Sequence, residues 1–189
     1  MTVYVRAHGI TGTPVVTLAG EDVGQVKDIV FDVSTGGVRC FTLAGRGLLA
    51  GPLRRALLWR NVHGLGPHAV MVRDGSALEE DDTAARSQDK KSAGANVLGL
   101  VVTTHSGVRM GTVGDAVIAT GRTPTVVGYE VETDDHRHVL VPVAEPVAVS
   151  GERILVPDAS AEHGVGDLGG FGAALDRLRS GPGRASRED

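Results

Sequence analysis

Short apolar runs separated by Gly, Pro, Asp and Ser make up most of this chain. The runs are about four to eight residues long, the length of a β-strand that is buried on one or both faces. Residues 38–44 and 125–131 alternate between apolar and other side chains, which is typical of a half-buried strand. Helical spacing of apolar residues is absent until the carboxyl-terminal end. The pattern therefore predicts an all-β fold with one late helix.

The same pattern occurs twice along the chain. The block Val23-Gly24-Gln25-Val26-Lys27-Asp28-Ile29-Val30 is matched by Met110-Gly111-Thr112-Val113-Gly114-Asp115-Ala116-Val117. Four identical pairs in these blocks are each 87 positions apart: Gly24 and Gly111, Val26 and Val113, Asp28 and Asp115, and Val30 and Val117. The triplet Val15-Val16-Thr17 recurs as Val101-Val102-Thr103 just before each block. Such self-similarity predicts two copies of one structural unit.

Each block is followed by a turn, an alternating strand and two further apolar runs. The two runs are residues 56–59 and 69–72 in the first copy, and residues 138–143 and 154–156 in the second. A unit of about 60 residues with five or six short strands leaves unpaired sheet edges unless the sheet closes on itself. We therefore predict two small β-barrels in tandem.

These observations divide the chain into six predicted parts. They are an amino-terminal segment (1–13), a first barrel (14–74), a polar linker (75–96), a second barrel (97–158), a helical segment (159–180) and a disordered tail (181–189). The linker is placed where Glu79-Glu80-Asp81-Asp82 precedes Lys90-Lys91, because this stretch lacks aromatic residues.

The helical segment has an apolar face. Leu168, Phe171, Leu175 and Leu178 follow one another at steps of three and four, and Asp167 is a suitable N-cap. Two interpretations remain open: the helix packs on the chain's own barrels, or it folds onto a partner through these four residues. We expect it to pack on the barrels, because an uncovered apolar stripe is a liability on a soluble protein.

The repeated motif resembles the PRC-barrel. The features that carry the resemblance are Gly-x-Val-x-Asp-[Ile/Ala]-Val, the turn and alternating strand after it, and the final Val-rich strand, Ile154-Leu155-Val156 in the second copy. The resemblance covers residues 14–74 and 97–158. The family includes the photosynthetic reaction-centre H subunit and a ribosome maturation factor. It implies a binding or assembly module without catalytic residues to carry over.

The composition of the chain limits the kinds of partner and the cellular location that we expect. The net charge of −4 gives no general attraction to nucleic acid or to anionic lipid. The single cysteine, Cys40, excludes an intrachain disulfide, and the chain has neither a signal-peptide pattern nor an apolar run of about 18 residues. We therefore expect a cytoplasmic protein that binds neither nucleic acid nor membranes.

One glycine-rich stretch deserves comparison with a phosphate-binding loop. Residues 45–52 contain three glycines, but Pro52 and the strand-like residues after it replace the helix that such a loop requires. We predict an extended loop in the first barrel. Because loops carry function more often than cores do, it is our preferred surface for a partner, with these contact residues: Arg46, Leu48, Leu49, Arg54 and Arg55.

The remaining candidates have structural interpretations. Asp134-Asp135 and the histidines at 136 and 138 are suitable ligands for Zn²⁺ or Ni²⁺, but a polar hairpin tip explains them equally, and we predict no metal. Gly24 and Gly111 are expected at bulges, and the two repeated aspartates at structural positions. Cys40 and Trp59 are expected to pack in the core.

The sequence thus predicts a protein that is not an enzyme and holds no cofactor. Our first hypothesis is a non-catalytic tandem PRC-barrel adaptor or assembly protein that binds a protein partner. The alternative is an RNA- or ribosome-associated maturation factor, by analogy with the family's ribosomal member. The scarcity of aromatic residues, at 3%, weakens that alternative, because aromatic side chains stack on bases.

Overall fold

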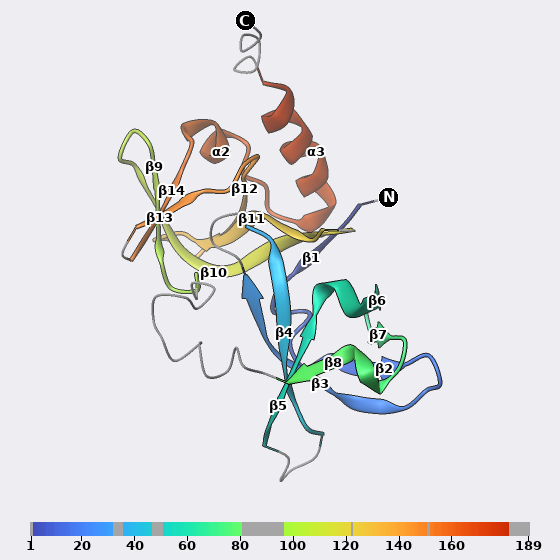
Figure 1. The fold of residues 1–189 in the computed structure, drawn as a ribbon. Coiled ribbons are helices and arrows are strands. Elements are labelled where there is room, and N and C mark those ends of the chain that lie inside the picture. Colours follow the sequence, from blue (N-terminus) through green and yellow to red (C-terminus); the bar gives the residue numbers. More distant parts are fainter. Residues whose placement is uncertain are drawn as a thin grey trace, which may run out of the picture. The chain divides into compact units, whose positions relative to one another are not determined.

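A computed structural model describes residues 2–31, 36–46, 51–80, 97–121, 123–150 and 152–181. The chain divides into two compact units, which we call the N-terminal and C-terminal units (Figure 1). The N-terminal unit consists of Val5–Asn96 and Thr120–Thr125. The C-terminal unit consists of Met1–Tyr4, Val97–Ala119 and Val126–Asp189.

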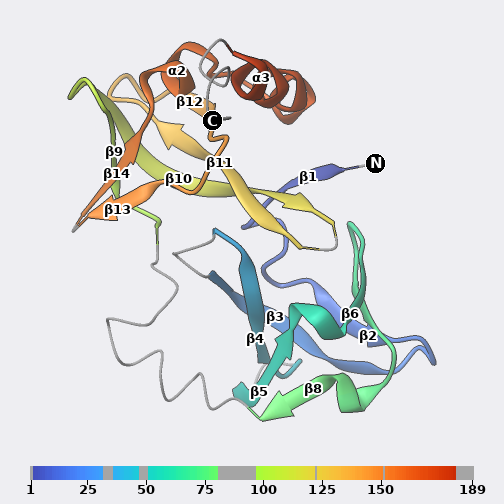
Figure 2. The same cartoon turned by 45° about the horizontal axis from the view of Figure 1, so that its top comes forward.

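The N-terminal unit is a seven-stranded sheet that curls into a half-barrel (Figure 2). Its strand order is β6-β7-β2-β3-β4-β5-β8, and β2 pairs with β7 in parallel while the other neighbours are antiparallel. The strands are β2 (Pro14–Thr17), β3 (Asp22–Phe31), β4 (Val38–Ala44), β5 (Pro52–Leu58), β6 (Val62–Leu65), β7 (Val70–Val72) and β8 (Leu78–Glu80). Two short 3-10 helices, η1 (Trp59–Asn61) and η2 (Gly75–Ala77), connect them.

The core of this unit lies inside the curl of the sheet. The alternating strand β4 places Phe41 and Leu43 in it, and both side chains are fully buried. The ring of Trp59 meets that of Phe41 edge to face, with centroids 5.9 Å apart. Cys40 is also fully buried on β4, as expected of a small core residue.

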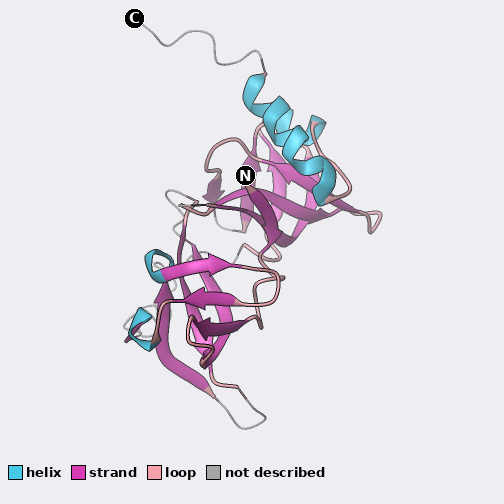
Figure 3. Cartoon of the chain, turned by 90° about the vertical axis from the view of Figure 1, so that its right-hand side faces the viewer, coloured by secondary structure: helices cyan, strands magenta, loops and turns pink. Residues whose placement is uncertain are grey.

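The C-terminal unit is a second sheet, with the order β12-β11-β10-β9-β14-β13, and β1 pairs with β10. The strands are β1 (Val3–Arg6), β9 (Val101–Thr104), β10 (Arg109–Thr120), β11 (Thr125–Glu132), β12 (His138–Pro142), β13 (Ala148–Ser150) and β14 (Arg153–Val156). Two helices follow the last strand, α2 (Asp158–Glu162) and α3 (Leu168–Ser180) (Figure 3).

The two sheets share one strand order over six strands. Each of the strands β6-β7-β2-β3-β4-β5 has a counterpart seven labels later. The counterparts follow one another as β13-β14-β9-β10-β11-β12, which is the order of the second sheet read from its other end. Backbone hydrogen bonds recur at the same 87-residue separation: Gly12 N–H donates to Val26 O and Gly99 N–H to Val113 O, both at 2.8 Å. The two glycines of the motif, Gly24 and Gly111, have φ angles of 144° and 146°. The sequence pairing of these glycines therefore corresponds to equivalent backbone positions.

One predicted alignment is wrong by a single residue. Val15 lies opposite Gly24, and the residue opposite Gly111 is Val102, not Val101. The triplet Val15-Val16-Thr17 thus corresponds to residues 102–104, whose third member is also a threonine. Because valines adjoin one another here, the letters alone fit either register, whereas the bulge at each glycine fixes it.

Two of the predicted boundaries also need correction. Residues 75–80, which we assigned to the polar linker, form η2 and β8, and β8 pairs with β5. Residues 81–96 lie outside the described residues. The amino-terminal segment contains β1 and two buried residues, Ile10 and Thr13. These short elements were not predicted because their pairing partners are distant in the sequence.

The carboxyl-terminal helix α3 packs on the strands of its own unit. Phe171 and Leu175 are fully buried in a cluster with Val117, Val127 and Leu140. Asp167 caps the helix by accepting a hydrogen bond from Gly170 N–H at 2.9 Å. This arrangement confirms the expected packing. It also corrects the assignment of Phe171 and Leu175 as partner contacts, because neither side chain has surface to offer.

The helical segment differs in detail from the prediction. It contains two helices, and between them Val165 exchanges two backbone hydrogen bonds with Leu140 of β12. Leu168 and Leu178 are half-buried at the edges of the α3 contact. Residues 182–189 of the predicted tail lie outside the described residues. Among the helices described, none has the length and apolar character to cross a bilayer.

Candidate functional site

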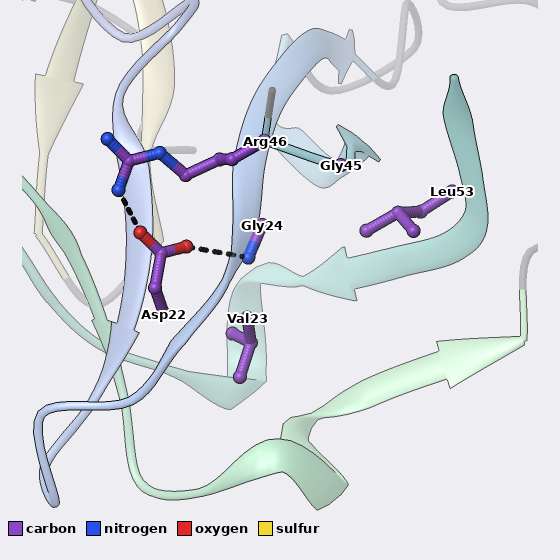
Figure 4. A pocket seen from close by; sticks show the side chains of 6 residues that line it. All are labelled: Asp22, Val23, Gly24, Gly45, Arg46 and Leu53. Atoms are coloured by element: carbon purple, nitrogen blue, oxygen red, sulfur yellow. Dashed lines mark hydrogen bonds and ion pairs between the residues drawn. The ribbon is translucent and has the colours of Figure 1, made fainter. Parts of the chain in front are cut away.

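A surface hollow of about 440 Å³ opens in the N-terminal unit, where β3 begins and β4 ends (Figure 4). One part of its wall is charged and comes from Asp22 and Arg46. Another part is apolar and comes from Val23 and Leu53, the second residue of β5. The lining is completed by Gly24 and Gly45. The hollow therefore offers charge and apolar surface side by side.

The bulge at Gly24 shapes this hollow. The register of β2 and β3 shifts between Val15 and Val16, and Gly24 takes the φ of 144° that glycine alone adopts readily. A Cβ at this position would stand 3.1 Å from both Ala44 O and Leu53 Cδ1. The glycine thus lets the end of β4 and the start of β5 approach β3 closely.

An ion pair holds the charged wall in place. The Asp22 carboxylate accepts from Gly24 N–H at 3.1 Å through Oδ1, and from Arg46 Nη1 through Oδ2 (Figure 4). The side chains of Asp22 and Arg46 remain 36% and 55% exposed. Because exposed ion pairs contribute only about 0–1 kcal/mol, this pair orients the two groups more than it stabilises the fold.

The C-terminal unit has the same ion pair with its charges exchanged. Arg109, 87 residues after Asp22, binds Asp134 with Nη2 and Oδ1 3.2 Å apart. Asp134 lies two residues beyond the end of β11, as Arg46 lies two residues beyond the end of β4. Both units therefore carry a pair of opposite charges at this point, but the sign of each member differs between them.

Of the other predicted contact residues, two lie on β5 outside the lining of the hollow and two cannot be placed. Arg54 and Arg55 follow Leu53 on β5 and are exposed. Arg55 lies opposite Glu80 of β8. Leu48 and Leu49 lie outside the described residues. At the base of their loop, Gly45 N–H donates to Gly51 O at 3.1 Å.

The histidines at 136 and 138 do not face one another along a strand. His136 lies in the turn after β11, with a φ of 59°, and its Nδ1 is 2.8 Å from Glu132 Oε1. His138 Nδ1 is 3.3 Å from a different carboxylate, Glu130. The hydrogen bond raises the pKa of His136 and lowers that of Glu132. Within the residues that the structure describes, no three His, Cys, Asp or Glu side chains gather as metal ligands.

The repeated aspartates occupy equivalent strands in different surroundings. The side chain of Asp28 is 67% exposed, whereas Asp115 is buried and accepts from Ala116 N–H at 2.8 Å. A shared catalytic role for the two is not supported, because an acid–base pair requires both groups to meet one substrate.

A second hollow, of about 320 Å³, lies beside η1 and η2. Its polar groups are largely engaged with one another: Arg60 binds Glu79 at 2.9 Å, and Asn61 donates to Ala77 O at 2.9 Å. Asp74 caps η2, and its hydrogen bonds with Ser76 lower the pKa of the carboxyl. The hydrogen bonds and the ion pair around this hollow therefore hold η1 and η2 in place.

The sequence identified Arg46 but missed Asp22, Val23 and Leu53. The signal that was available is partial, because Asp22 corresponds to Arg109 at the 87-residue separation, whereas Arg46 corresponds to Asp134 only at a separation of 88. Opposite changes at two positions of a repeat indicate spatial contact. No comparable signal marks Leu53, because its approach to the hollow depends on the bulge at Gly24.

Comparison with known proteins agrees with the observed topology. No curated protein matches the chain. The family model of the PRC-barrel domain matches residues 3–77, which run from β1 to η2 and include every lining residue of the first hollow. Residues 3–77 of this chain therefore contain a PRC-barrel domain.

Proposed function

We propose that the chain is a non-catalytic cytoplasmic adaptor, built from two PRC-type units, that binds a protein partner through the hollow of the N-terminal unit. The observation that carries the proposal is the composition of this hollow. An oriented ion pair lies beside the apolar surface of Val23 and Leu53, and exposed arginines follow on β5. Interfaces between proteins combine these features, with an apolar centre and a polar rim that favours arginine.

The proposal of a second PRC-type unit rests on the shared strand order of the two sheets. It also rests on the hydrogen bonds that recur at the 87-residue separation. Duplication leaves one copy free to keep its sequence for stability while the other adapts its surface. The exchanged charges of the two ion pairs fit this division. The pair of Asp22 and Arg46 lines the hollow of the N-terminal unit, and the pair of Arg109 and Asp134 has the opposite arrangement of charge.

The non-catalytic part of the proposal rests on the lining of the hollow. Its only carboxylate, Asp22, is bound to Arg46, and the other lining residues are Val, Gly and Leu. A nucleophile needs a neighbouring base, and a general base needs a proton within hydrogen-bond reach. The hollow supplies neither of these pairs.

Affinity capture from an extract of the source cells tests the proposal. The bait is the full chain, with Leu53→Glu as the test variant and Leu18→Glu as the matched control. Leu18 lies in the same unit, outside the hollow, and is 55% exposed. We expect the same proteins on the unmodified and Leu18→Glu baits, their loss on Leu53→Glu, and no effect of RNase.

Two results oppose the proposal. Equal capture by all three baits places binding elsewhere on the chain. Loss of the captured proteins after RNase supports the alternative of an RNA- or ribosome-associated factor. Circular dichroism of the Leu53→Glu protein ensures that a loss of capture is not a loss of fold.

A further inference from the structure

We infer that the edge of β3 at residues 27–31 binds an extended segment of a partner protein, which adds a strand to the N-terminal sheet. This edge lies beyond residues 22–24, the part of β3 that lines the hollow. The inference therefore goes beyond the proposed function and does not depend on it. It follows from the comparison of β3 with β10, its counterpart in the C-terminal unit.

Two strands share one edge of β10. β9 pairs with residues 109–112, and Val113 N–H donates to Leu100 O, just before β9, at 2.9 Å. β11 occupies the opposite edge, and its last residue, Glu132, adjoins Gly111 near the start of β10. Because β1 also pairs with β10, it lies on the same side as β9, beyond Val113. This edge of β10 is therefore paired in both its first and its second half.

The equivalent edge of β3 is paired only in its first half. β2 pairs with residues 22–25, and Val26 N–H donates to Thr13 O at 2.9 Å. β4 occupies the opposite edge as far as Phe31. In the part of the chain that the structure describes, no strand pairs with residues 27–31 on the side of β2. The N-terminal sheet thus has no described counterpart of β1.

Burial along the two edges differs in the same way. Three residues in the second half of β10 are at most 1% exposed: Ala116, Val117 and Ile118. Their counterparts 87 residues earlier are only half-buried: Ile29, Val30 and Phe31. These three apolar side chains of β3 therefore keep surface that a partner can remove from water, which favours binding.

The backbone at this edge is suited to strand addition. Asp28 N–H donates to Thr42 Oγ1 of β4 at 3.1 Å, so this amide points away from the edge. Because successive residues of a strand direct their backbone groups to opposite sides, Ile29 directs its N–H and C=O to the edge. An added strand pairs with such groups. Register shifts precede Asp28 and follow Val30, so we expect a short segment, like β1 with its four residues.

The C-terminal unit also indicates the chemistry of the segment. Val117 lies in a cluster with Phe171 of α3, and Tyr4 of β1 packs against that cluster, with its ring centroid 5.5 Å from that of Phe171. Among the described residues, both α-helices belong to the C-terminal unit. The partner segment must therefore cover Val30 itself. A large apolar or aromatic residue at the place of Tyr4, between β-branched neighbours that favour a strand, meets this need.

A peptide with the sequence of residues 2–7, which contains β1, is the probe. It is titrated to about 1 mM into the isotope-labelled full chain, and amide NMR signals and hydrogen exchange are followed. We expect shifts at residues 27–31 and slower exchange of Ile29 N–H. No shift there overturns the inference. An Ile29 amide that is already protected in the free chain also overturns it, because the edge is then occupied. Shifts confined to β10 overturn it as well, because the peptide then only replaces β1.

Modified peptides provide matched controls that leave the protein unchanged. One peptide carries N-methyl groups on Val3 and Val5, and the other carries them on Tyr4 and Arg6. An extended strand turns alternate N–H groups to one edge, so one pair of methyl groups should abolish binding and the other should not. Equal effects of the two pairs overturn strand addition. Tyr4→Ala in the peptide should weaken binding about fivefold or more, and unchanged affinity overturns the proposed apolar contact.

Two variants of the protein locate the contact. Val30→Ala should weaken binding of the peptide about threefold or more, because it removes apolar surface at the edge of β3. Leu18→Ala removes an apolar side chain that is 55% exposed elsewhere in the same unit, and it should leave the affinity unchanged. Circular dichroism of both variants checks that the fold is kept. Equal weakening by the two variants overturns the inference, because general apolar attraction then explains the binding.

Discussion

Gly128 of β11 lies directly beneath the ring of Phe171 of α3. A Cβ on residue 128 would stand 2.5 Å from Phe171 Cζ and 2.7 Å from Val141 O, closer than non-bonded carbon and oxygen atoms approach. Gly128 lies opposite Pro142 on β12, as Cys40 lies opposite Leu58 on β5. The helix therefore rests on the C-terminal sheet at a position where only glycine leaves room for an aromatic ring.

Replacing Gly128 with alanine should destabilise the protein. The added methyl group has a ring on one side and a carbonyl on the other, and overpacking of this kind costs about 1–3 kcal/mol. The control is Gly170→Ala in α3, where the new Cβ meets nothing closer than 3.9 Å and helix propensity favours alanine by about 1 kcal/mol. Urea unfolding should separate the variants in opposite directions. A Gly128→Ala protein as stable as the parent contradicts the close contact.

Removal of residues 165–189 should lower the melting temperature and cause aggregation. The deletion takes away the fully buried Phe171 and Leu175, and it uncovers the apolar side chains on which they pack. It also removes Val165, which pairs with the edge of β12. Phe171→Ala alone should cost about 3–5 kcal/mol. A monodisperse truncation that melts with the parent would show that α3 serves a partner instead.

The repeat pattern predicted more of the fold than the apolar runs did. Gly24 and Gly111 lie at equivalent bulges, and the strands after them have the same order, because similar sequences set the same turns and strands. The letters of β4 also predicted a strand, although its burial does not alternate strictly, because the adjacent Cys40 and Phe41 are both fully buried. Residues whose role is set within one strand or turn were therefore predictable.

What the sequence did not predict depends on distant partners. Leu78–Glu80 is acidic and short, and it becomes a strand only because β5 offers an edge to pair with. Leu53 lines the hollow because the bulge at Gly24 brings it there. The orientation of the Arg46 side chain depends on its ion pair with Asp22, which lies 24 residues earlier. In each case a tertiary contact decided the outcome, and no local preference signals it.

Exchanging the charges of Asp22 and Arg46 should leave the fold intact. The variant that combines Asp22→Arg with Arg46→Asp reproduces the arrangement of Arg109 and Asp134. Each single substitution places like charges together and should cost about 0.2–1 kcal/mol, and the double variant should recover this repulsion but not the hydrogen bond from Gly24 N–H to Asp22. Urea unfolding of all four proteins gives the coupling energy. Additive losses would mean that the two side chains do not interact in solution.

Low pH should weaken the hydrogen bonds that hold the turn between β9 and β10 to Asp158. Asp158 Oδ1 accepts from Ser106 Oγ at 2.5 Å and from Ser106 N–H at 3.2 Å, and these bonds lower the pKa of Asp158 below 3.8. A carboxyl whose pKa is lower in the folded state contributes stability above its unfolded pKa. That contribution is lost as pH falls through the folded pKa.

Ser106→Ala should therefore raise the pKa of Asp158 towards 3.8, measured by NMR titration, and lower stability more above that pH than below it, because the bond between Ser106 Oγ and Thr104 Oγ1 is lost at every pH. Ser160→Ala is the control, because the Ser160 hydroxyl has no hydrogen-bond partner in the described part of the chain. Removing it should be neutral or slightly favourable. A stability loss for Ser106→Ala that is the same at all pH values would rule out the carboxylate as its cause.

Replacing His136 and His138 by alanine should change the melting temperature little at about pH 8 and more at about pH 5.5. The pKa of His136 is raised from 6.5 by its hydrogen bond with Glu132, so its contribution is present below pH 6.5 and lost as pH rises through the folded pKa. Glu132→Gln should reduce the pH dependence of the difference, because it removes the charge that favours the His136 imidazolium, whereas Glu130 still lies beside His138.

The same double variant tests the prediction that the protein holds no metal. The imidazoles of His136 and His138 lie against different carboxylates, Glu132 and Glu130, so they do not converge on one point. A structural Zn²⁺ site needs four ligands in a tetrahedron. Elemental analysis of the purified parent should find no stoichiometric metal. About one Zn²⁺ per chain, lost in the double variant together with a large fall in melting temperature, would show that the turn rearranges around an ion.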